Sequence, residues 1–467
     1  MDQTLQTAGS YIHGDPIAPV ILGVTSILLF AVIGRFAARK LDQPTVLGEL
    51  LMGILLGNIA WYMGVDLITV LREGPRVFEV VYQALAGVPI DQAAASIFGP
   101  EKAVEIARIV TGPQGGQVMQ VAQTVDVFSR YGVIFLLFMV GLDANLDELR
   151  KAGADSLRVA VIGVVAPLAL GFAAVYLLLP DQPLNTDLFV AATLGATSIG
   201  ITANVLRELE RSGSREGHII LGAAVFDDIL GLIILAVVSG IVVSGSINIE
   251  EIVTVIIVSA LFLFGAMSLG PTTVRFAAKI MGRLDIVEAK MFTSYLFVML
   301  LAWAANLAGL ATIIGAFAAG IILSDSFFSE YENARNRPIR IRELIMPLEV
   351  ILVPIFFILM GMQVKLEAFM SWPVITVAAG LLVAAVVGKL LCGFGARKPV
   401  DKLVVGIGML PRGEVGLVFA AIGRTLGVID DAIFSAIVLM VMVTTLVAPP
   451  LLKVAIRAQS KREALEV

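Results

Sequence analysis

Charge is scarce in this sequence of 467 residues. Charged residues make up 15% of the chain, whereas a soluble globular protein has about 25%. Hydrophobic residues make up 58%. Apolar runs of about twenty residues recur from residue 18 to residue 457, and each is long enough to cross roughly 30 Å of hydrocarbon. The composition therefore excludes an ordinary soluble domain and predicts an all-α membrane protein with many spans.

Cysteine and histidine are nearly absent. The single cysteine, Cys392, excludes an internal disulfide, and its position in an apolar run favours a buried structural residue over a reactive thiol. The two histidines, His13 and His218, are too few for a histidine-rich metal site. His218 directly precedes an apolar run, where a surface residue is favoured over a pH sensor that titrates near neutrality.

Nucleotide-binding motifs are also missing. Residues 380–391, GLLVAAVVGKLL, contain a Gly-Lys pair but lack the Ser or Thr that follows in a phosphate-binding loop. This disfavours an ATP-driven pump, and we expect no enzyme activity, no cofactor and no nucleotide or nucleic-acid partner. The N-terminal segment MDQTLQTAGSYIHGDP has no Lys or Arg and does not resemble a cleavable signal peptide.

The apolar runs predict about thirteen membrane-spanning helices. Their expected bounds are 18–37, 45–63, 126–145, 157–179, 186–206, 219–242, 249–269, 290–308, 310–325, 345–362, 373–395, 402–423 and 431–455. Most of the 33 Lys and Arg fall in loops on the side of the C-terminus, and the opposite short loops hold only Lys365 and Arg424. Because cytoplasmic loops carry such an excess, we expect the N-terminus outside and the C-terminus in the cytoplasm.

One loop, from about residue 64 to residue 125, is much longer than the others. Its segments 75–87 and 99–110 have the pattern of short amphipathic helices. We interpret the loop as an insertion that caps the membrane domain on the outer side.

Five ionisable residues are expected at membrane depth, away from the ends of the predicted spans: Asp227, Asp228, Lys389, Arg412 and Glu414. Each costs roughly 2.5–3.5 kcal/mol at the centre of a bilayer unless it is compensated. These side chains are therefore expected to pair with one another or to face water. A plain structural alternative is that Asp227 and Lys389 only fasten two helices together. Glu49, near a predicted span end, is expected at the membrane interface.

Two of the predicted spans have signs of a break in mid-membrane. Residues 192–206, ATLGATSIGITANVL, contain two glycines and the hydroxyls of Thr197, Ser198 and Thr202, and residues 406–420, GIGMLPRGEVGLVFA, contain Pro411 within the membrane. Spans four to six and eleven to thirteen repeat this order seven spans apart and so in opposite orientation. Inverted repeats with broken helices form the ion sites of many secondary transporters. The hydroxyls either lie near the ion or bond the freed carbonyls.

The chain resembles the NapA-type bacterial sodium/proton antiporters, the Asp-Asp branch of the monovalent cation:proton antiporter superfamily. The resemblance rests on the stretches LDQPTVLGELLMGILLG, FLLFMVGLDANL, GATSIGITANVLREL, IILGAAVFDDILGLI, IIGAFAAGIILS, VVGKLLCGFGA and GIGMLPRGEVGLV, in family order. It implies one transporter domain over 1–467, with two crossed discontinuous helices. The long insertion departs from the family pattern.

The resemblance also assigns roles to residues. It implies that Asp228 is the principal carboxylate for Na⁺, and that Asp227 binds Lys389 when no cation is present. The supporting ion site comprises residues of the two breaks, namely Thr197, Ser198, Thr202, Glu414 and Arg412. It further implies a homodimer with an interface subdomain over 18–63 and 249–325 and a mobile core subdomain over 126–242 and 345–455. The GILLG run of residues 53–57 is a small-residue pattern that fits a dimer face.

These features predict exchange of Na⁺ or Li⁺ for H⁺ by alternating access of the elevator type. If Lys389 releases its proton when Na⁺ frees it from Asp227, two protons exchange per Na⁺ and transport is electrogenic. Potassium/proton exchange on the same fold, or a sodium-coupled organic-anion symporter, are the alternatives, and charge directly in the path disfavours a channel. A bacterial-type cytoplasmic membrane and an internal energised membrane such as a thylakoid fit the sequence equally.

Overall fold

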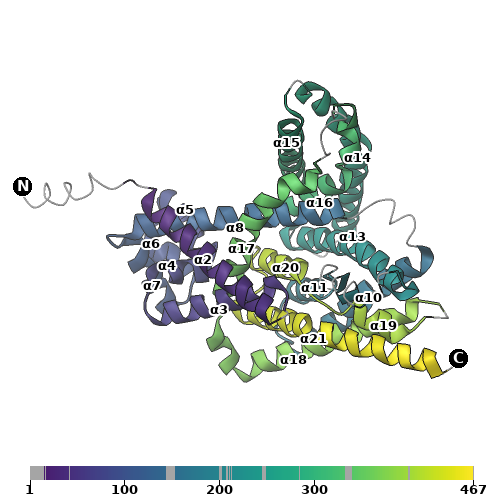
Figure 1. Cartoon of the computed structure of the whole chain (residues 1–467). Helices are drawn as coiled ribbons and strands as arrows, with labels where there is room; N and C mark the ends of the chain where they lie inside the picture. Colours follow the sequence, from purple (N-terminus) through teal and green to yellow (C-terminus); the bar gives the residue numbers. More distant parts are fainter. Residues whose placement is uncertain are drawn as a thin grey trace, which may run out of the picture. The chain divides into compact units, whose positions relative to one another are not determined.

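The computed structural model describes most of the chain. The described residues are 15, 17–41, 43–143, 153–198, 202–203, 205–206, 209, 211, 213–244, 249–282, 284–331, 339–397 and 400–465. Every regular element among them is a helix (Figure 1). The chain separates into two compact units, which we call the first unit (residues 1–131 and 354–363) and the second unit (residues 132–353 and 364–467).

The first unit begins with a hairpin of two apolar helices, α2 (Ala18–Lys40) and α3 (Thr45–Tyr62). They approach closely because Gly34 and Gly48 face each other, and a Cβ on either would collide with the backbone of the other. Beside this contact, Arg35 of α2 forms an ion pair with Glu49 of α3. Glu49 is completely buried inside the protein, and its expected position at the membrane interface stays a prediction. The carboxylate is held inside the unit by a cation fourteen residues earlier in the chain.

The GILLG run of α3 packs inside the first unit. A Cβ added at Gly53 would collide with the backbone of Ile358 and Gly361, and one at Gly57 would meet the backbone of Met362. These three residues belong to α17 (Ile341–Met362), whose last residues belong to this unit. The small residues therefore serve close helix packing within one chain, and the interpretation of this run as a dimer face is wrong.

The insertion folds as four short helices, which are α4 (Asp66–Glu73), α5 (Arg76–Leu85), α6 (Ile90–Ile97) and α7 (Pro100–Thr111). The two amphipathic helices expected at 75–87 and 99–110 are thus confirmed as α5 and α7. Arg72 is buried. Its guanidinium carbon lies 4.3 Å from the centroid of the Trp61 ring, and its Nη2 atom donates a 2.8 Å hydrogen bond to Oδ1 of Asn58. Since Trp61 and Asn58 belong to α3, these contacts fasten the insertion to the apolar hairpin.

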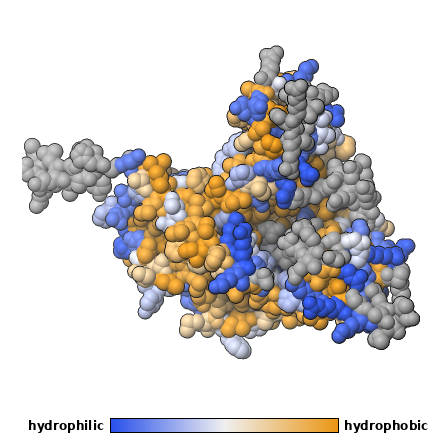
Figure 2. Space-filling view, in the orientation of Figure 1, coloured by the Kyte–Doolittle hydropathy of each residue, from blue (hydrophilic) through white to orange (hydrophobic). Residues whose placement is uncertain are grey.

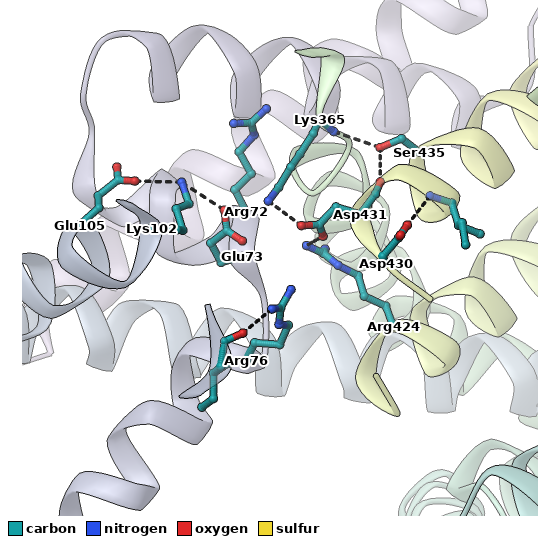
Figure 3. Close-up of polar contacts among 12 residues, drawn as sticks. Arg72, Glu73, Arg76, Lys102, Glu105, Lys365, Arg424, Asp430, Asp431 and Ser435 are labelled. Carbon is teal, nitrogen blue, oxygen red and sulfur yellow. Dashed lines mark hydrogen bonds and ion pairs between the residues drawn. The ribbon is translucent and has the colours of Figure 1, made fainter. Parts of the chain in front are cut away.

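A second polar contact ties the insertion helices to one another. Lys102 of α7 lies 3.2 Å from a carboxylate oxygen of the buried Glu73 of α4 and 2.9 Å from that of Glu105 (Figure 3). Close by in sequence, Arg76 donates to the carbonyl oxygen of Ile97 at 2.6 Å.

Ten helices in the described parts of the chain are long and apolar enough to cross a membrane. Besides α2, α3 and α17, they are α8 (Gly115–Asp143), α10 (Gly153–Leu178), α13 (Arg215–Ser244), α14 (Ile249–Met281), α15 (Ile286–Leu307), α18 (Trp372–Cys392) and α21 (Asp431–Leu465). Large hydrophobic side chains are exposed on them, and Figure 2 shows broad hydrophobic areas of surface. On α2 alone Leu22, Leu29, Val32 and Phe36 are 58–71% exposed. The chain is an integral membrane protein with the predicted all-helical fold.

The remaining predicted spans are short or interrupted. Span nine is α16 (Thr312–Ile322), and spans five and twelve are broken. Some bounds also differ, because α8 begins at Gly115, α14 continues through Pro271 to Met281, and α21 runs on to Leu465. The sequence bounds followed hydropathy, whereas a helix continues beyond its apolar part wherever its backbone hydrogen bonds can still form.

In the second unit, α10 packs against α11 (Leu184–Thr193), α13 and α18. The approach of α10 to α18 is close at Gly388, where a Cβ would lie 2.6 Å from the backbone of Pro167. Cys392 is fully buried in a hydrophobic cluster formed by residues of α10, α13, α18, α19 (Lys402–Gly408) and α21. Its environment is that of a packing residue.

Candidate ion site

Two interrupted helices form the centre of the second unit. Helix α11 ends at Thr193, and residues 194–198 are non-helical. Helix α19 ends at Gly408, residues 409–413 are non-helical, and α20 (Glu414–Thr425) follows. We call residues 194–198 the first break and residues 409–413 the second break. Both predicted discontinuous spans are thereby confirmed, and the glycines together with Pro411 are the local cause.

The two breaks cross in direct contact. The backbone N–H of Ser198 donates to the carbonyl oxygen of Pro411 at 2.9 Å. A Cβ added at Gly413 would lie 2.7 Å from Cβ of Ser198, so only glycine fits at this approach. The hydroxyls of Thr197 and Thr202 donate to the carbonyl oxygens of Met409 (3.4 Å) and Gly408 (2.7 Å). These hydroxyls therefore satisfy carbonyls that the second break frees from helical bonding.

Two buried cations occupy the carbonyl end of α11. Arg412 Nη1 donates to the carbonyl oxygen of Leu194 and, at 2.8 Å, to that of Ala196. Lys389 Nζ donates to the carbonyl oxygen between them, that of Gly195, at 2.8 Å. A helix C-terminus carries partial negative charge. Three successive carbonyls of the first break are thus compensated by side chains from two other spans.

The predicted pair of Asp227 and Lys389 lies at the same point. Lys389 Nζ is 2.9 Å from Oδ1 of Asp227, and neither side chain is exposed. Asp228, the next residue of α13, is 5% exposed. Within the described residues, Oδ2 of Asp227 and the Nε and Nη2 atoms of Arg412 have no hydrogen-bond partner. The site therefore has acceptors and donors beyond those used in its own contacts, as a site that holds an ion or water requires.

Gly163 of α10 borders the pair. A Cβ added there would lie 3.3 Å from Cβ of Cys392, 3.6 Å from Nζ of Lys389 and 3.7 Å from Oδ1 of Asp227. Sequence reasoning missed this residue, because a glycine in an apolar helix gives no sign of what it faces.

Glu414 is the one predicted site residue whose side chain lies outside the description. Its backbone begins α20 directly after the second break. Its expected role in the supporting site stays a prediction. His218 is exposed, with Nδ1 2.9 Å from the carbonyl oxygen of Ser214, as expected of a surface residue.

Helix α21 contacts the broken span α19–α20 at three points along its length. The sequence suggests none of these contacts. Near one end, Arg462 lies 2.9 Å from Asp401, whose side chain caps α19. In the middle, the hydroxyl of Thr445 donates to the carbonyl oxygen of Arg412 in the second break. At the other end, Asp431 lies 2.6 Å from Arg424 of α20 (Figure 3).

Asp431 also lies 2.6 Å from Lys365. Lys365 and Arg424 are the two cations that the sequence assigns to the sparsely charged side, and they share one carboxylate. The backbone N–H of Lys365 further donates to the hydroxyl of Ser435 at 3.3 Å. This contact holds the chain between α17 and α18 against the beginning of α21.

Known proteins resemble the chain over most of its length. Residues 25–458 match the family described as "Sodium/hydrogen exchanger, transmembrane". The chain is 36% identical to the high-affinity Na⁺/H⁺ antiporter NhaS3 of Synechocystis sp., over 96% of this chain and 94% of that one. It is 32% identical to the Na⁺/H⁺-K⁺ antiporter GerN of Bacillus cereus, over 76% and 89% of the two chains.

A solved structure shares the fold. The sodium proton antiporter MjNhaP1 from Methanocaldococcus jannaschii aligns with a TM-score of 0.58 over 93% of this chain and 96% of that chain, at 17% sequence identity.

Proposed function

Because the chain belongs to the sodium/hydrogen exchanger family, we propose that it exchanges Na⁺ or Li⁺ for H⁺ across a membrane. The names of its relatives NhaS3 and GerN support this activity. The observation that carries the proposal is the dehydrated pair of Asp227 and Lys389 at the carbonyl end of α11, with Asp228 beside it.

The proposed chemistry is competition for acidic oxygens. A buried carboxylate must be neutralised by a proton, a cation or a fixed positive side chain. Lys389 is the positive side chain that neutralises Asp227, and it also donates a hydrogen bond to the carbonyl oxygen of Gly195. We propose that Na⁺ binds at Asp228 and Asp227 and displaces Lys389, and that protons displace Na⁺ in turn. This assignment would put the chain in the Asp-Asp branch of the superfamily.

The residues of the breaks have a supporting role in this proposal. Arg412 compensates the carbonyl end of α11, and Thr197, Ser198 and Thr202 hold the second break against the first. A rigid crossing keeps the ion site in one geometry while its occupant changes. Glu414 would balance the charge of Arg412.

Obligatory exchange follows if the empty site moves slowly because its charge is dehydrated. If Lys389 loses its proton when Na⁺ displaces it, two protons are exchanged for one Na⁺ and one net charge crosses per cycle. We propose an elevator-type movement in a homodimer, with an interface subdomain of residues 18–63 and 249–325 and a core subdomain of residues 126–242 and 345–455. The insertion would then lie outside and the C-terminus in the cytoplasm, in either a cytoplasmic or an internal energised membrane.

Potassium is the second candidate cation. The relative GerN is named for Na⁺/H⁺-K⁺ antiport, and it is 32% identical to this chain. Exchange of K⁺ for H⁺ would use the same carboxylates. Membership of the exchanger family disfavours the organic-anion symporter.

Proton flux in proteoliposomes tests the proposal. Addition of Na⁺, Li⁺ or K⁺ to acid-loaded vesicles should dissipate the pH gradient, and the cation that acts at the lowest concentration is the substrate. Asp228→Asn should abolish the response, because the amide can neither carry the negative charge nor take up a proton. Normal exchange by Asp228→Asn would refute the assignment of this residue. Measurement of current at zero pH gradient separates electrogenic from neutral exchange.

A further inference from the structure

The second break is held by donors from two different directions. The carbonyl oxygens of Gly408, Met409 and Pro411 accept from the hydroxyls of Thr202 and Thr197 and the N–H of Ser198, all on or after the first break. The carbonyl oxygen of Arg412 instead accepts from the hydroxyl of Thr445 on α21. Thr445 is 4% exposed and Arg412 is completely buried, so this bond forms away from solvent.

Arg412 connects this bond to the ion site. Its backbone is fixed by Thr445, and its guanidinium Nη1 binds the carbonyls of Leu194 and Ala196. The carbonyl between these two, that of Gly195, binds Lys389, which pairs with Asp227. A continuous series of contacts therefore connects α21 to the acidic pair. It consists of these hydrogen bonds, the ion pair, and the covalent bonds within Arg412 and within the first break.

We propose that Thr445 is a positioning residue for cation binding, which acts through the peptide group and side chain of Arg412. The inference rests on the proposed cation/proton exchange. A buried carbonyl that loses its donor takes up water or turns toward another donor. Either change rotates the peptide group next to the Arg412 side chain, so its Nη1 atom cannot keep both carbonyls of the first break, those of Leu194 and Ala196. The carbonyl end of α11 then shifts relative to Lys389 and the ion-binding oxygens.

The neighbouring Thr444 is a matched control. It is 1% exposed, and its hydroxyl donates to the carbonyl oxygens of Met440 (2.9 Å) and Val441 (3.0 Å) of its own helix. Substitution by valine removes one buried hydroxyl at either position with almost no change of shape. Only the Thr445 substitution removes a contact with the second break.

The experiment compares Thr445→Val, Thr445→Ser and Thr444→Val in proteoliposomes, with apparent KM and maximal rate measured for the cation that the wild type transports. We expect Thr445→Val to raise KM about threefold to tenfold, the factor that corresponds to one lost buried hydrogen bond. Thr445→Ser should keep the wild-type KM because it retains the donor, and Thr444→Val should also keep it. Rates are normalised to folded protein, because a merely structural role would lower the folded amount and leave KM unchanged.

A wild-type KM in Thr445→Val, or an equal rise in Thr444→Val, overturns the inference. If Thr445→Val does not fold, Thr445→Ala and Thr445→Ser make the same comparison, with only the serine variant expected to keep the wild-type KM. Failure of the wild type to exchange any cation refutes the proposed function instead, so the two failures are distinguishable.

Discussion

Lys389 and Asp227 form a salt bridge of 2.9 Å in which neither side chain is exposed to solvent. The bridge joins α18 to α13, and the bond from Lys389 to the Gly195 carbonyl adds the first break. Buried ion pairs contribute little net stability, but removal of one partner leaves a buried charge without compensation. The pair is therefore suited to a partner exchange in which another cation takes the place of the lysine.

Lys389→Met should destabilise the protein by about 3–5 kcal/mol, since it leaves the Asp227 carboxylate without its cation. Asp227→Asn should destabilise the protein by a similar amount, since it leaves the Lys389 ammonium group without its carboxylate. The double variant should be more stable than either single variant, because both charges are gone. Thermal unfolding in detergent measures all three. Additive losses in the double variant would show that the two side chains act independently.

The site was partly predictable from the sequence because its signals are local. Charges inside apolar runs single out Asp227, Asp228, Lys389 and Arg412, since such charges are costly there. Glycines and Pro411 in the middle of a span indicate the breaks, because these residue types disfavour a continuous helix. These signals need no knowledge of what lies beside the residue in space.

The partners of these residues were not predictable. Arg412 binds backbone carbonyls, and every residue type carries a carbonyl. Thr445 is one of two adjacent threonines in an apolar helix, and only the fold determines which of them faces the second break. The ion pair of the buried Glu49 with Arg35 of the preceding helix gives no sign in the sequence either. The sequence pattern gives the position of a residue along a helix, whereas its neighbours depend on packing between helices.

Gly413→Ala should disrupt the crossing of the breaks. The added Cβ would lie 2.7 Å from Cβ of Ser198, which forces the two breaks apart and costs about 1–3 kcal/mol as overpacking does. Cation/proton exchange should fall with it. Gly213→Ala is the control, because nothing lies within 4 Å of a Cβ added there. Proton flux and thermal unfolding of both variants provide the comparison, and equal effects would contradict the tight contact at Gly413.

The stability of the insertion should depend on pH through Lys102. Burial lowers the pKa of this amine, but Glu105 and Glu73 raise it by more, and the net pKa is above its ordinary value of 10.5. A raised folded-state pKa means that the ion pairs stabilise the fold fully below the unfolded pKa and are lost as pH rises through the folded one. Lys102→Met should therefore be less stable than the wild type at pH 7 to 9, and the difference should disappear in strongly alkaline solution. Amide exchange in α7 measures this, and a difference that grows with pH would contradict it.

Asp431→Asn should weaken the end of the unit where α20, α21 and the chain before α18 meet. The carboxylate accepts from Lys365 and from the buried Arg424, at 2.6 Å each. The amide cannot bind both cations, and each charge-assisted bond contributes about 1.5–3 kcal/mol. We expect a lower unfolding temperature that is partly restored in Asp431→Asn combined with Lys365→Met, since the double variant no longer holds the Lys365 ammonium there. Asp430→Asn is the matched control, because the Asp430 side chain accepts only the backbone N–H of Ile433 among the described contacts, and asparagine caps a helix about as well as aspartate. An equal loss in both single variants would contradict a specific role of the carboxylate that Lys365 and Arg424 share.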